Sequence, residues 1–302
     1  MQFLYVLESI RHPVLDAFFS VITYLGSEWL FIGVAVAVFW CYNKRDGYYL
    51  LAVGLLGTVI NQVMKIACQV PRPWVRDPNF TIVESARADA GGYSFPSGHC
   101  QNVTVVGGCI ARAVKKTWVR VVSVVLIVLV CFSRMYLGVH TPTDVAVGFG
   151  CALVLVFVLY PLFRKSDEKP RIITAVFALG ALLSLGAVVY VEVYPWAADV
   201  DAGNLAETIK VSYTMLGCAA GALVGQPLEQ RYVKFDTRAP WWGQLIKCVV
   251  GVGLVLGVKA ALKAPLLALF HGHEAATAVR YFIVVLIALV LWPMTFKRFK
   301  KK

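Results

Sequence analysis

The stretch VVSVVLIVLVCFSRMYLGVHTPTDVAVGFGCALVLVFVLY, residues 121–160, decides the fold class. Two long apolar runs flank a short polar segment that contains His140 and Asp144. A run of about 20 apolar residues crosses the hydrocarbon core of a bilayer as a helix, because lipid offers no partner to a free backbone N–H group. The stretch therefore predicts two membrane helices joined by a short loop.

The rest of the chain repeats this pattern. It has 302 residues, of which 59% are hydrophobic, compared with roughly 45–50% in soluble domains. The ten-residue alternation of a membrane β-barrel is missing. We therefore predict an all-α, polytopic transmembrane helical bundle of nine or ten spans. The nine are 26–42, 47–69, 98–114, 119–137, 142–162, 171–191, 211–227, 243–262 and 277–295.

The N-terminal residues leave the tenth span open. Residues 14–25, VLDAFFSVITYL, are short for a span, and either lie in the membrane interface or form a short extra helix. A removable signal peptide is not predicted, because the N-terminus lacks a basic flank and a small-residue cleavage site. The eight cysteines lie mostly inside apolar runs without CxxC spacing, which predicts small buried side chains and neither disulfides nor metal ligands.

The formal net charge of +12 is distributed unevenly. When alternate loops are assigned to opposite sides of the membrane, 19 of the 29 lysines and arginines fall on one side. The positive-inside rule identifies that side, which includes the C-terminus, as the cytoplasm. Membrane topology therefore explains the net positive charge, and no nucleic-acid partner is predicted. The 19 are Lys44, Arg45, Arg112, Lys115, Lys116, Arg120, Arg164, Lys165, Lys169, Arg171, Arg231, Lys234, Arg238, Lys247 and five in the tail KRFKKK, residues 297–302.

Three polar clusters lie on the opposite, outer side. The first contains Lys65 and Arg72, which a continuous helix would place on one face, although Pro71 and Pro73 must interrupt it. The second is PSGH, residues 96–99, where a serine at a helix start can cap the helix and leave backbone N–H groups free.

The third cluster is SRMYLGVHTPTD, residues 133–144, which adds Arg134, His140 and Asp144. Its last four residues have the pattern of a helix start, with a capping threonine, a proline at the first position and an acid in the first turn. A histidine close to Asp144 can be held in one tautomer with its other nitrogen free to attack.

Together the clusters predict an anion site suited to phosphate. Two helix N-termini direct N–H groups to one region, and Lys65, Arg72 and Arg134 add three full charges. Each cluster alone has a structural alternative: a histidine that caps a helix, a lysine that extends to the headgroups, or an ion-pair network between Arg134 and Asp144. Three clusters on the same predicted face favour the phosphate site.

These residues carry a resemblance to a known family. The chain resembles the type 2 phosphatidic acid phosphatase superfamily, which includes membrane lipid phosphatases, soluble acid phosphatases and vanadium haloperoxidases. The resemblance covers roughly residues 14–165. The three signature motifs are matched in order and spacing by Lys65-x6-Arg72-Pro73, by Pro96-Ser97-Gly98-His99 and by Ser133-Arg134-x5-His140-x3-Asp144.

The resemblance implies a role for each matched residue. His140 is implied to attack phosphorus and form a phosphohistidine, Asp144 to orient it, and His99 to protonate the leaving oxygen. It implies no cofactor and no metal, and the sequence contains no carboxylate cluster for Mg²⁺. The implied phosphate-binding residues are Lys65, Arg72, Ser97, Gly98 through its amide, and Arg134.

The membrane setting favours a lipid phosphate or pyrophosphate as substrate, hydrolysed at the extracytoplasmic face of the plasma membrane. Undecaprenyl pyrophosphate is the first candidate if the protein is bacterial, followed by phosphatidylglycerol phosphate and phosphatidic acid. The long loop 74–93 is a candidate lid or mouth, with Trp74 and Phe80 as interface anchors. A lipid phosphotransferase would use the same residues. A lipid transporter is a weaker alternative, because no inverted repeat is evident.

The remaining third of the chain is predicted to be an appended domain. Residues 1–165 form the predicted phosphatase core, and residues 166–302 form a helical transmembrane domain whose role the sequence leaves open. Gly217, Gly221 and Gly225 give one helix a smooth face, for which we favour packing within the bundle over homodimerisation. Glu229 continues this spacing, and we expect it to meet a basic residue. The oligomeric state is not predicted.

Lys259, Lys263 and Arg280 lie toward the outer side, against the charge bias. Ionisable groups inside spans are candidates for function, so a second anion or headgroup site is one hypothesis. Extension of these side chains to the interface, or pairing with Glu274, is the alternative.

Overall fold

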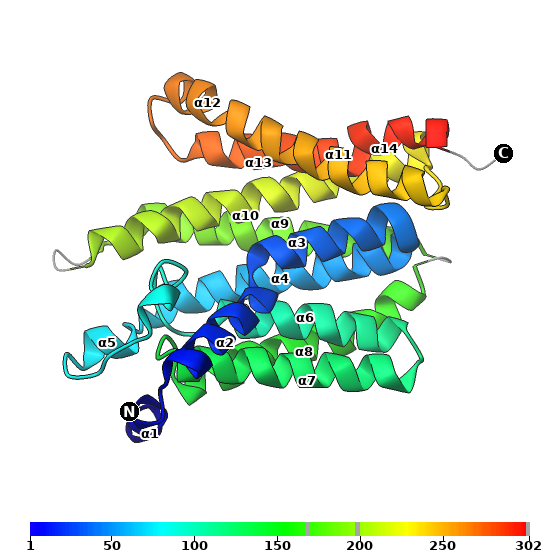
Figure 1. Ribbon diagram of the computed structural model, residues 1–302. Helices are drawn as coiled ribbons and strands as arrows, with labels where there is room; N and C mark the ends of the chain where they lie inside the picture. The colour runs from blue at the N-terminus through cyan, green and yellow to red at the C-terminus, as the bar shows by residue number, and fades with distance from the viewer. Residues whose placement is uncertain (167–168, 197–199, 300–302) are drawn as a thin grey trace. The chain divides into compact units, whose positions relative to one another are not determined.

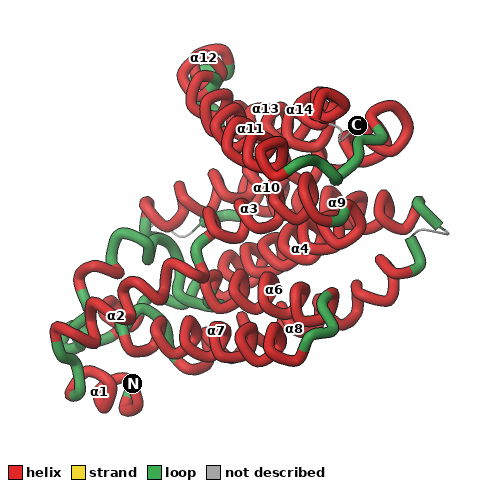
Figure 2. The backbone as a smooth tube through the Cα atoms, turned by 45° about the vertical axis from the view of Figure 1, so that its right-hand side comes forward, coloured by secondary structure: helices red, strands yellow, loops and turns green. Residues whose placement is uncertain are grey.

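The computed structural model describes residues 1–166, 169–196 and 200–299, and Figure 1 traces their course. Throughout these residues the secondary structure is helical, and Figure 2 shows helices and loops without a strand. The predicted all-α class is therefore confirmed. Lys300, Lys301 and Lys302 of the predicted basic tail lie outside the described residues.

The chain divides into two compact units, each built from separate stretches. The first unit comprises Met1–Ile32, Leu56–Tyr160 and Trp196–Thr208, and the second comprises Gly33–Leu55, Pro161–Pro195 and Ile209–Lys302. The predicted division at residue 165 stays a prediction.

Helices of the first unit carry the three polar clusters. The unit contains α1 (Gln2–Ser9), α2 (Pro13–Thr23), η1 (Tyr24–Gly26), α5 (Pro73–Arg76), η3 (Glu84–Ala86), α6 (Gly98–Ala113) and α7 (Thr117–Tyr136), with most of α8 (Pro142–Arg164) and the second half of α4 (Lys44–Cys68). Helices α6, α7 and α8 run side by side in both views (Figures 1 and 2).

The second unit is built from longer apolar helices. It contains the second half of α3 (Glu28–Ala37), η2 (Val38–Tyr42), the first half of α4, α9 (Arg171–Val193), most of α10 (Ala202–Leu228), η4 (Glu229–Val233), α11 (Trp241–Ala261), α12 (Lys263–Leu269), α13 (Ala275–Leu286), η5 (Ile287–Leu291), α14 (Trp292–Met294) and η6 (Thr295–Phe299). Only 11% of the most apolar part of Trp241–Leu269 is buried within the chain, as a lipid-facing helix requires.

Seven helical segments of the described chain are long and apolar enough to cross a membrane, and a bent pair raises the number to eight. The protein is thus a multi-pass membrane protein, but the predicted nine or ten spans exceed this count. The difference lies at residues 98–114, where α6 has 16 residues. A helix of that length rises about 24 Å, short of the roughly 30 Å hydrocarbon core.

The N-terminal segment 14–25 resolves into a helix. It forms α2, and the pair Pro13–Gly26 and Glu28–Tyr42 is bent by 46° at a short break. Pro13 occupies the first turn of α2, where its missing N–H group is tolerated. The segment is helical, and the choice between an interfacial position and an extra span stays a prediction.

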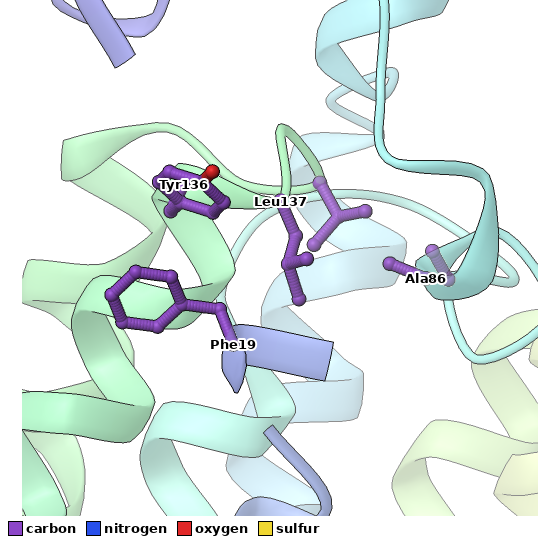
Figure 3. Close-up of a cluster of buried hydrophobic side chains, with 6 residues drawn as sticks. Phe19, Ala86, Tyr136 and Leu137 are labelled. Carbon is purple, nitrogen blue, oxygen red and sulfur yellow. The ribbon is translucent and has the colours of Figure 1, made fainter. Parts of the chain in front are cut away.

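An apolar cluster holds the loop between α7 and α8 in place. Phe19 of α2, Ala86 of η3, and Tyr136 and Leu137 at the end of α7 are buried together (Figure 3). The Leu137 carbonyl accepts a hydrogen bond from the Val83 amide at 3.1 Å. Three distant stretches of the chain therefore fix the segment that leads to His140.

The cysteines are reduced and differ in exposure. All eight cysteines are free. Most are buried or half-buried, whereas Cys68 is exposed at the end of α4.

Candidate active site

His140 and Asp144 form the centre of the candidate site. Both are 2% exposed, and His140 Nδ1 lies 3.5 Å from Asp144 Oδ2. Asp144 also closes the start of α8: its carboxylate accepts from the Thr141 amide at 2.8 Å, and its own amide donates to Thr141 Oγ1 at 3.3 Å. This reciprocal cap is the predicted helix start, and it fixes the carboxylate beside the imidazole.

Arg72 joins the first cluster to the third. Its Nη1 atom lies 3.0 Å from His140 Nε2 and donates to the Val139 carbonyl at 3.1 Å. Arginine has donors only, so Nε2 must accept with its lone pair. The imidazole proton then resides on Nδ1, on the side of Asp144. The geometry thus selects one neutral tautomer whose Nε2 lone pair faces a guanidinium.

Further bonds of Arg72 hold the loop before the second cluster. Its Nε atom donates to the Gly92 carbonyl at 3.1 Å, and its Nη2 atom donates to the Gly91 carbonyl at 2.7 Å. The predicted lid is therefore tied to the site at its end. Phe80 of the same loop is buried at 3% exposure beside Leu4 and Leu7, so its predicted role as an interface anchor is wrong.

Backbone contacts bring the second cluster to the third. The Ser97 amide donates to the Asp144 carbonyl at 3.0 Å. A Cβ atom at Gly148 would lie 2.5 Å from the Ser97 carbonyl oxygen, so only glycine allows α8 to approach this closely. Ser97 precedes α6, yet its side chain makes no capping bond, and its buried Oγ has no hydrogen-bond partner among the described residues.

Arg134 of α7 is fully buried with most of its donors unused. Its Nη1 atom donates to Thr23 Oγ1 at 2.7 Å, whereas Nε and Nη2 have no partner within the described chain. Buried guanidinium donors without partners are costly, and they mark a place where an anion can bind. Together with Ser97 Oγ and His140 Nδ1, they are buried polar atoms that lack a hydrogen-bond partner among the described residues.

Lys65 and His99 complete the set of predicted residues. Lys65 donates from Nζ to the Tyr93 carbonyl, next to the Gly92 carbonyl held by Arg72. Arg72 does not lie on the helix of Lys65: α4 ends at Cys68, Gln69 has a φ of +45°, and Arg72 precedes α5, in agreement with the interruption expected at Pro71 and Pro73. His99 lies in the first turn of α6, where its backbone contacts Gly26 closely.

The electrostatic surroundings keep His140 neutral. Burial lowers the pKa of His140 well below its usual range, and the charges of Arg72, Arg134 and Lys65 lower it further. His99 contributes in the same direction. A neutral imidazole is the form that can act as a nucleophile.

Two contributors were missed by the sequence analysis. Ser94 is fully buried, and its Oγ donates to Asp144 Oδ2 at 2.5 Å. Thr23 binds Arg134 from α2. Neither had a signal in the sequence, because Ser94 resembles any loop serine and Thr23 lies outside the three clusters.

The second predicted anion site is only partly assembled. Lys259 Nζ and Arg280 Cζ each lie 5.3 Å from the centroid of the Tyr281 ring. Lys263 is exposed and begins α12, after α11 has ended at Ala261, so it does not continue the helix of Lys259. The alternative pairing partner, Glu274, accepts a hydrogen bond from Thr277 Oγ1 at 2.6 Å.

The glycine stripe and Glu229 behave as predicted. Gly217, Gly221 and Gly225 approach Ala278, Val285 and Leu289 of the α13–η5 segment within the same chain. Glu229 is 1% exposed and meets Lys44 Nζ at 2.6 Å.

Comparisons with known proteins match two parts of the chain. Residues 46–168 match the PAP2 superfamily, and residues 213–302 match the family described as PAP2 superfamily phosphatase, transmembrane extension. The first match spans all three polar clusters.

Three relatives illustrate the similarity. Phosphatidylglycerophosphatase B of Bacillus subtilis is 33% identical over 173 residues, which cover 53% of this chain and 79% of the relative. Lipid A 4'-phosphatase of Porphyromonas gingivalis is 26% identical over 171 residues, covering 54% and 72% respectively. Undecaprenyl-diphosphatase of Sulfolobus acidocaldarius is 29% identical over 126 residues, covering 41% and 59%.

Proposed function

Because this chain belongs to the PAP2 superfamily and to its lipid phosphatases, we propose that it hydrolyses a lipid phosphate or pyrophosphate through a phosphohistidine, without a metal ion. One observation carries the proposal: His140 presents the lone pair of Nε2 to Arg72 Nη1 at 3.0 Å while Asp144 lies at Nδ1. This is a nucleophile held in its reactive tautomer beside a cation that can bind the group under attack.

In the first step, His140 Nε2 forms a bond to phosphorus as the bond from phosphorus to the lipid oxygen breaks. His99 donates a proton to that leaving oxygen. Asp144 stabilises the positive charge on the imidazole. In the second step, water loses a proton to His99 and attacks phosphorus, which breaks the nitrogen–phosphorus bond and releases phosphate.

The fixed charges stabilise the transferring group. Lys65 and Arg72 of the first cluster bind phosphoryl oxygens, and Arg134 donates to them from its unused Nε and Nη2 atoms. Ser97 Oγ and the Gly98 amide supply further donors at the start of α6. Phosphoryl transfer depends mainly on such positioned charges, and three cations here take the part that metal ions have in other phosphatases.

The charge bias along the chain supports an extracytoplasmic site in the plasma membrane and a cytoplasmic C-terminus. We assign the catalytic role to residues 1–165 and treat 166–302 as an appended helical domain. The separate matches to residues 46–168 and 213–302 support that division.

The substrate is proposed from the names of the relatives. They act on a phosphatidylglycerophosphate, on lipid A and on undecaprenyl diphosphate, so the shared feature is a terminal phosphate on a membrane lipid. Undecaprenyl pyrophosphate remains the first candidate, with phosphatidylglycerol phosphate and phosphatidic acid next.

The decisive test is phosphate release from these three lipids by the purified full chain, comparing wild type with His140→Ala. We expect release from at least one lipid by the wild type and its loss in the variant. Transfer of the phosphate to an added alcohol, without free phosphate, would instead identify a phosphotransferase. Release that survives in His140→Ala would refute the mechanism.

We also propose that Lys259, Lys263 and Arg280 attract an anionic headgroup. The approach of Lys259 and the buried Arg280 to the Tyr281 ring supports a shared cationic region. If Lys263→Ala and Arg280→Ala leave activity, substrate affinity and lipid binding unchanged, this second proposal fails.

A further inference from the structure

A pair of thiols joins two distant stretches of the second unit. Cys41 lies in η2 and Cys248 in α11, and their Sγ atoms are 3.4 Å apart although 207 positions separate the residues. No CxxC spacing announces this contact, and both cysteines are free in the structure. Neither residue takes part in the candidate active site.

Other contacts hold the backbone around the two thiols together. Gln244 of α11 donates from Nε2 to the Cys41 carbonyl at 3.3 Å, and Cys41 Sγ lies 3.8 Å from the Gln244 carbonyl oxygen. Trp40, which is fully buried beside Cys41, donates from Nε1 to the Ala288 carbonyl at 2.9 Å. A Cβ atom at Gly251 would lie 2.6 Å from the Trp40 ring, so α11 approaches η2 this closely because a glycine stands there. The fold itself therefore brings the two thiols together.

Closure of the pair into a disulfide requires a small movement. A disulfide has an S–S length of about 2.05 Å, so the sulfur atoms must approach by roughly 1.4 Å. Rotation about the Cα–Cβ bond of each cysteine moves its sulfur atom without moving the helix. Both side chains are half-buried, whereas Cys100, Cys109 and Cys131 are buried. A small oxidant therefore has access to this pair.

Both cysteines lie near the helix ends that face the predicted cytoplasm. Lys44 follows Cys41 within one turn, and Cys248 lies about two turns after α11 begins at Trp241. Basic residues accumulate on this side of the chain. Cellular reductants keep cytosolic thiols reduced, and disulfides that form there are usually transient and redox-sensing. We therefore expect a dithiol at rest, which is oxidised only when an oxidant is present.

We propose that Cys41 and Cys248 form a reversible modification site that hydrogen peroxide oxidises to a disulfide. One thiolate attacks a peroxide oxygen, the O–O bond breaks, the sulfur becomes a sulfenic acid and hydroxide leaves. The other thiolate attacks that sulfur and displaces a second hydroxide, and the two protons lost by the thiols convert both hydroxides to water. Two thiols are thus oxidised to one disulfide while one peroxide is reduced to two waters, and a dithiol reductant reverses the change. The new bond ties η2 covalently to α11, independently of the proposed hydrolysis.

The test maps disulfides in the purified full chain after treatment with a small molar excess of hydrogen peroxide. Remaining thiols are blocked with iodoacetamide, the protein is digested without reduction, and mass spectrometry identifies linked peptides. We expect a peptide that joins Cys41 to Cys248, loss of these two free thiols, and recovery of both after dithiothreitol. The matched control is Cys68→Ala, which removes an exposed cysteine at the end of α4 and should leave the link unchanged.

The single variants Cys41→Ala and Cys248→Ala test the order of the steps. Each removes the link, and in one of them the remaining thiol should stay a sulfenic acid that reacts with dimedone, because the second thiol is missing. Absence of this adduct from both variants would overturn the sulfenic acid step. Wild type that keeps both thiols under peroxide, or that joins either cysteine mainly to Cys68, would overturn the proposal. The wild-type measurement needs no substitution, so a variant that fails to fold does not affect it.

Discussion

Each unit contains a buried cluster of charged residues, and the two clusters differ in whether the chain itself satisfies the buried charge. In the first unit, Arg134 is fully buried with Nε and Nη2 unpartnered among the described residues. In the second, Glu229 is equally buried but is closed by Lys44 and Tyr48. A charge satisfied by its own chain contributes to the fold, whereas donors left unused at a cost in folding energy indicate a ligand.

The largest effect that this comparison predicts concerns the nucleophile. His140→Ala should lower phosphate release at least about 1,000-fold, because it removes the nitrogen that would form the bond to phosphorus. The measurement is release of inorganic phosphate from the preferred lipid, with Arg238→Ala, an exposed residue paired with Asp236, as the control. A variant that retains a tenth of the activity would contradict the assignment.

Arg134→Lys tests whether the unused donors serve the reaction. Lysine keeps the charge but loses the planar arrangement of Nε and Nη2, so we expect kcat/KM to fall about 100-fold. Steady-state kinetics in detergent micelles provide the measurement. Activity within threefold of wild type would mean that charge alone is sufficient there.

Thermal unfolding separates the two clusters directly. Glu229→Gln should lower stability by about 2 kcal/mol, because it leaves Lys44 without its carboxylate at a partly exposed position. Arg134→Met should instead raise the unfolding midpoint, because it removes buried donors that the described chain does not satisfy. A midpoint for Arg134→Met as low as that for Glu229→Gln would remove the distinction between the clusters.

Ser94 offers a smaller test within the active site. Ser94→Ala removes the 2.5 Å hydrogen bond to Asp144, and we expect kcat to fall about tenfold. Since Ser94 acts by positioning Asp144, the pH dependence of kcat should shift as well, and Ser94→Thr should restore much of the rate. A change in stability alone would assign Ser94 to the fold.

The smallest expected effect follows from the three cations. If Lys65, Arg72 and Arg134 stabilise the transferring phosphoryl group, chelation with EDTA should leave the rate unchanged. The assay compares initial rates before and after dialysis against the chelator. A loss that added Mg²⁺ restores would contradict the metal-independent mechanism.

Much of the site was predictable because its chemistry is local in sequence. His140 and Asp144 are four residues apart on one helix start, and the reciprocal cap at Thr141 follows from residue types alone. The bond between Arg72 and His140 joins positions 68 residues apart. The spacing within each cluster could not reveal it.

The differences between the predicted and the observed structure have physical causes. The break between Lys65 and Arg72 was expected from Pro71 and Pro73, but its position at Cys68, before the prolines, was not. The described helices long enough to span number fewer than the predicted nine or ten, because α6 is shorter than its apolar run. The interface position predicted for Phe80 was wrong because Leu4 and Leu7, which lie far away in the chain, bury its side chain.

The sequence by itself determined the membrane setting and the residue types of the site, because lipid imposes helical backbone on long apolar runs and phosphate chemistry requires cations beside a nucleophile. Only the tertiary structure decided which donors stay unused, which carboxylate closes on Lys44, and that Ser94 and Thr23 support the site. Hydrogen-bond satisfaction depends on atoms brought together across many residues, and no periodicity in one chain encodes that geometry.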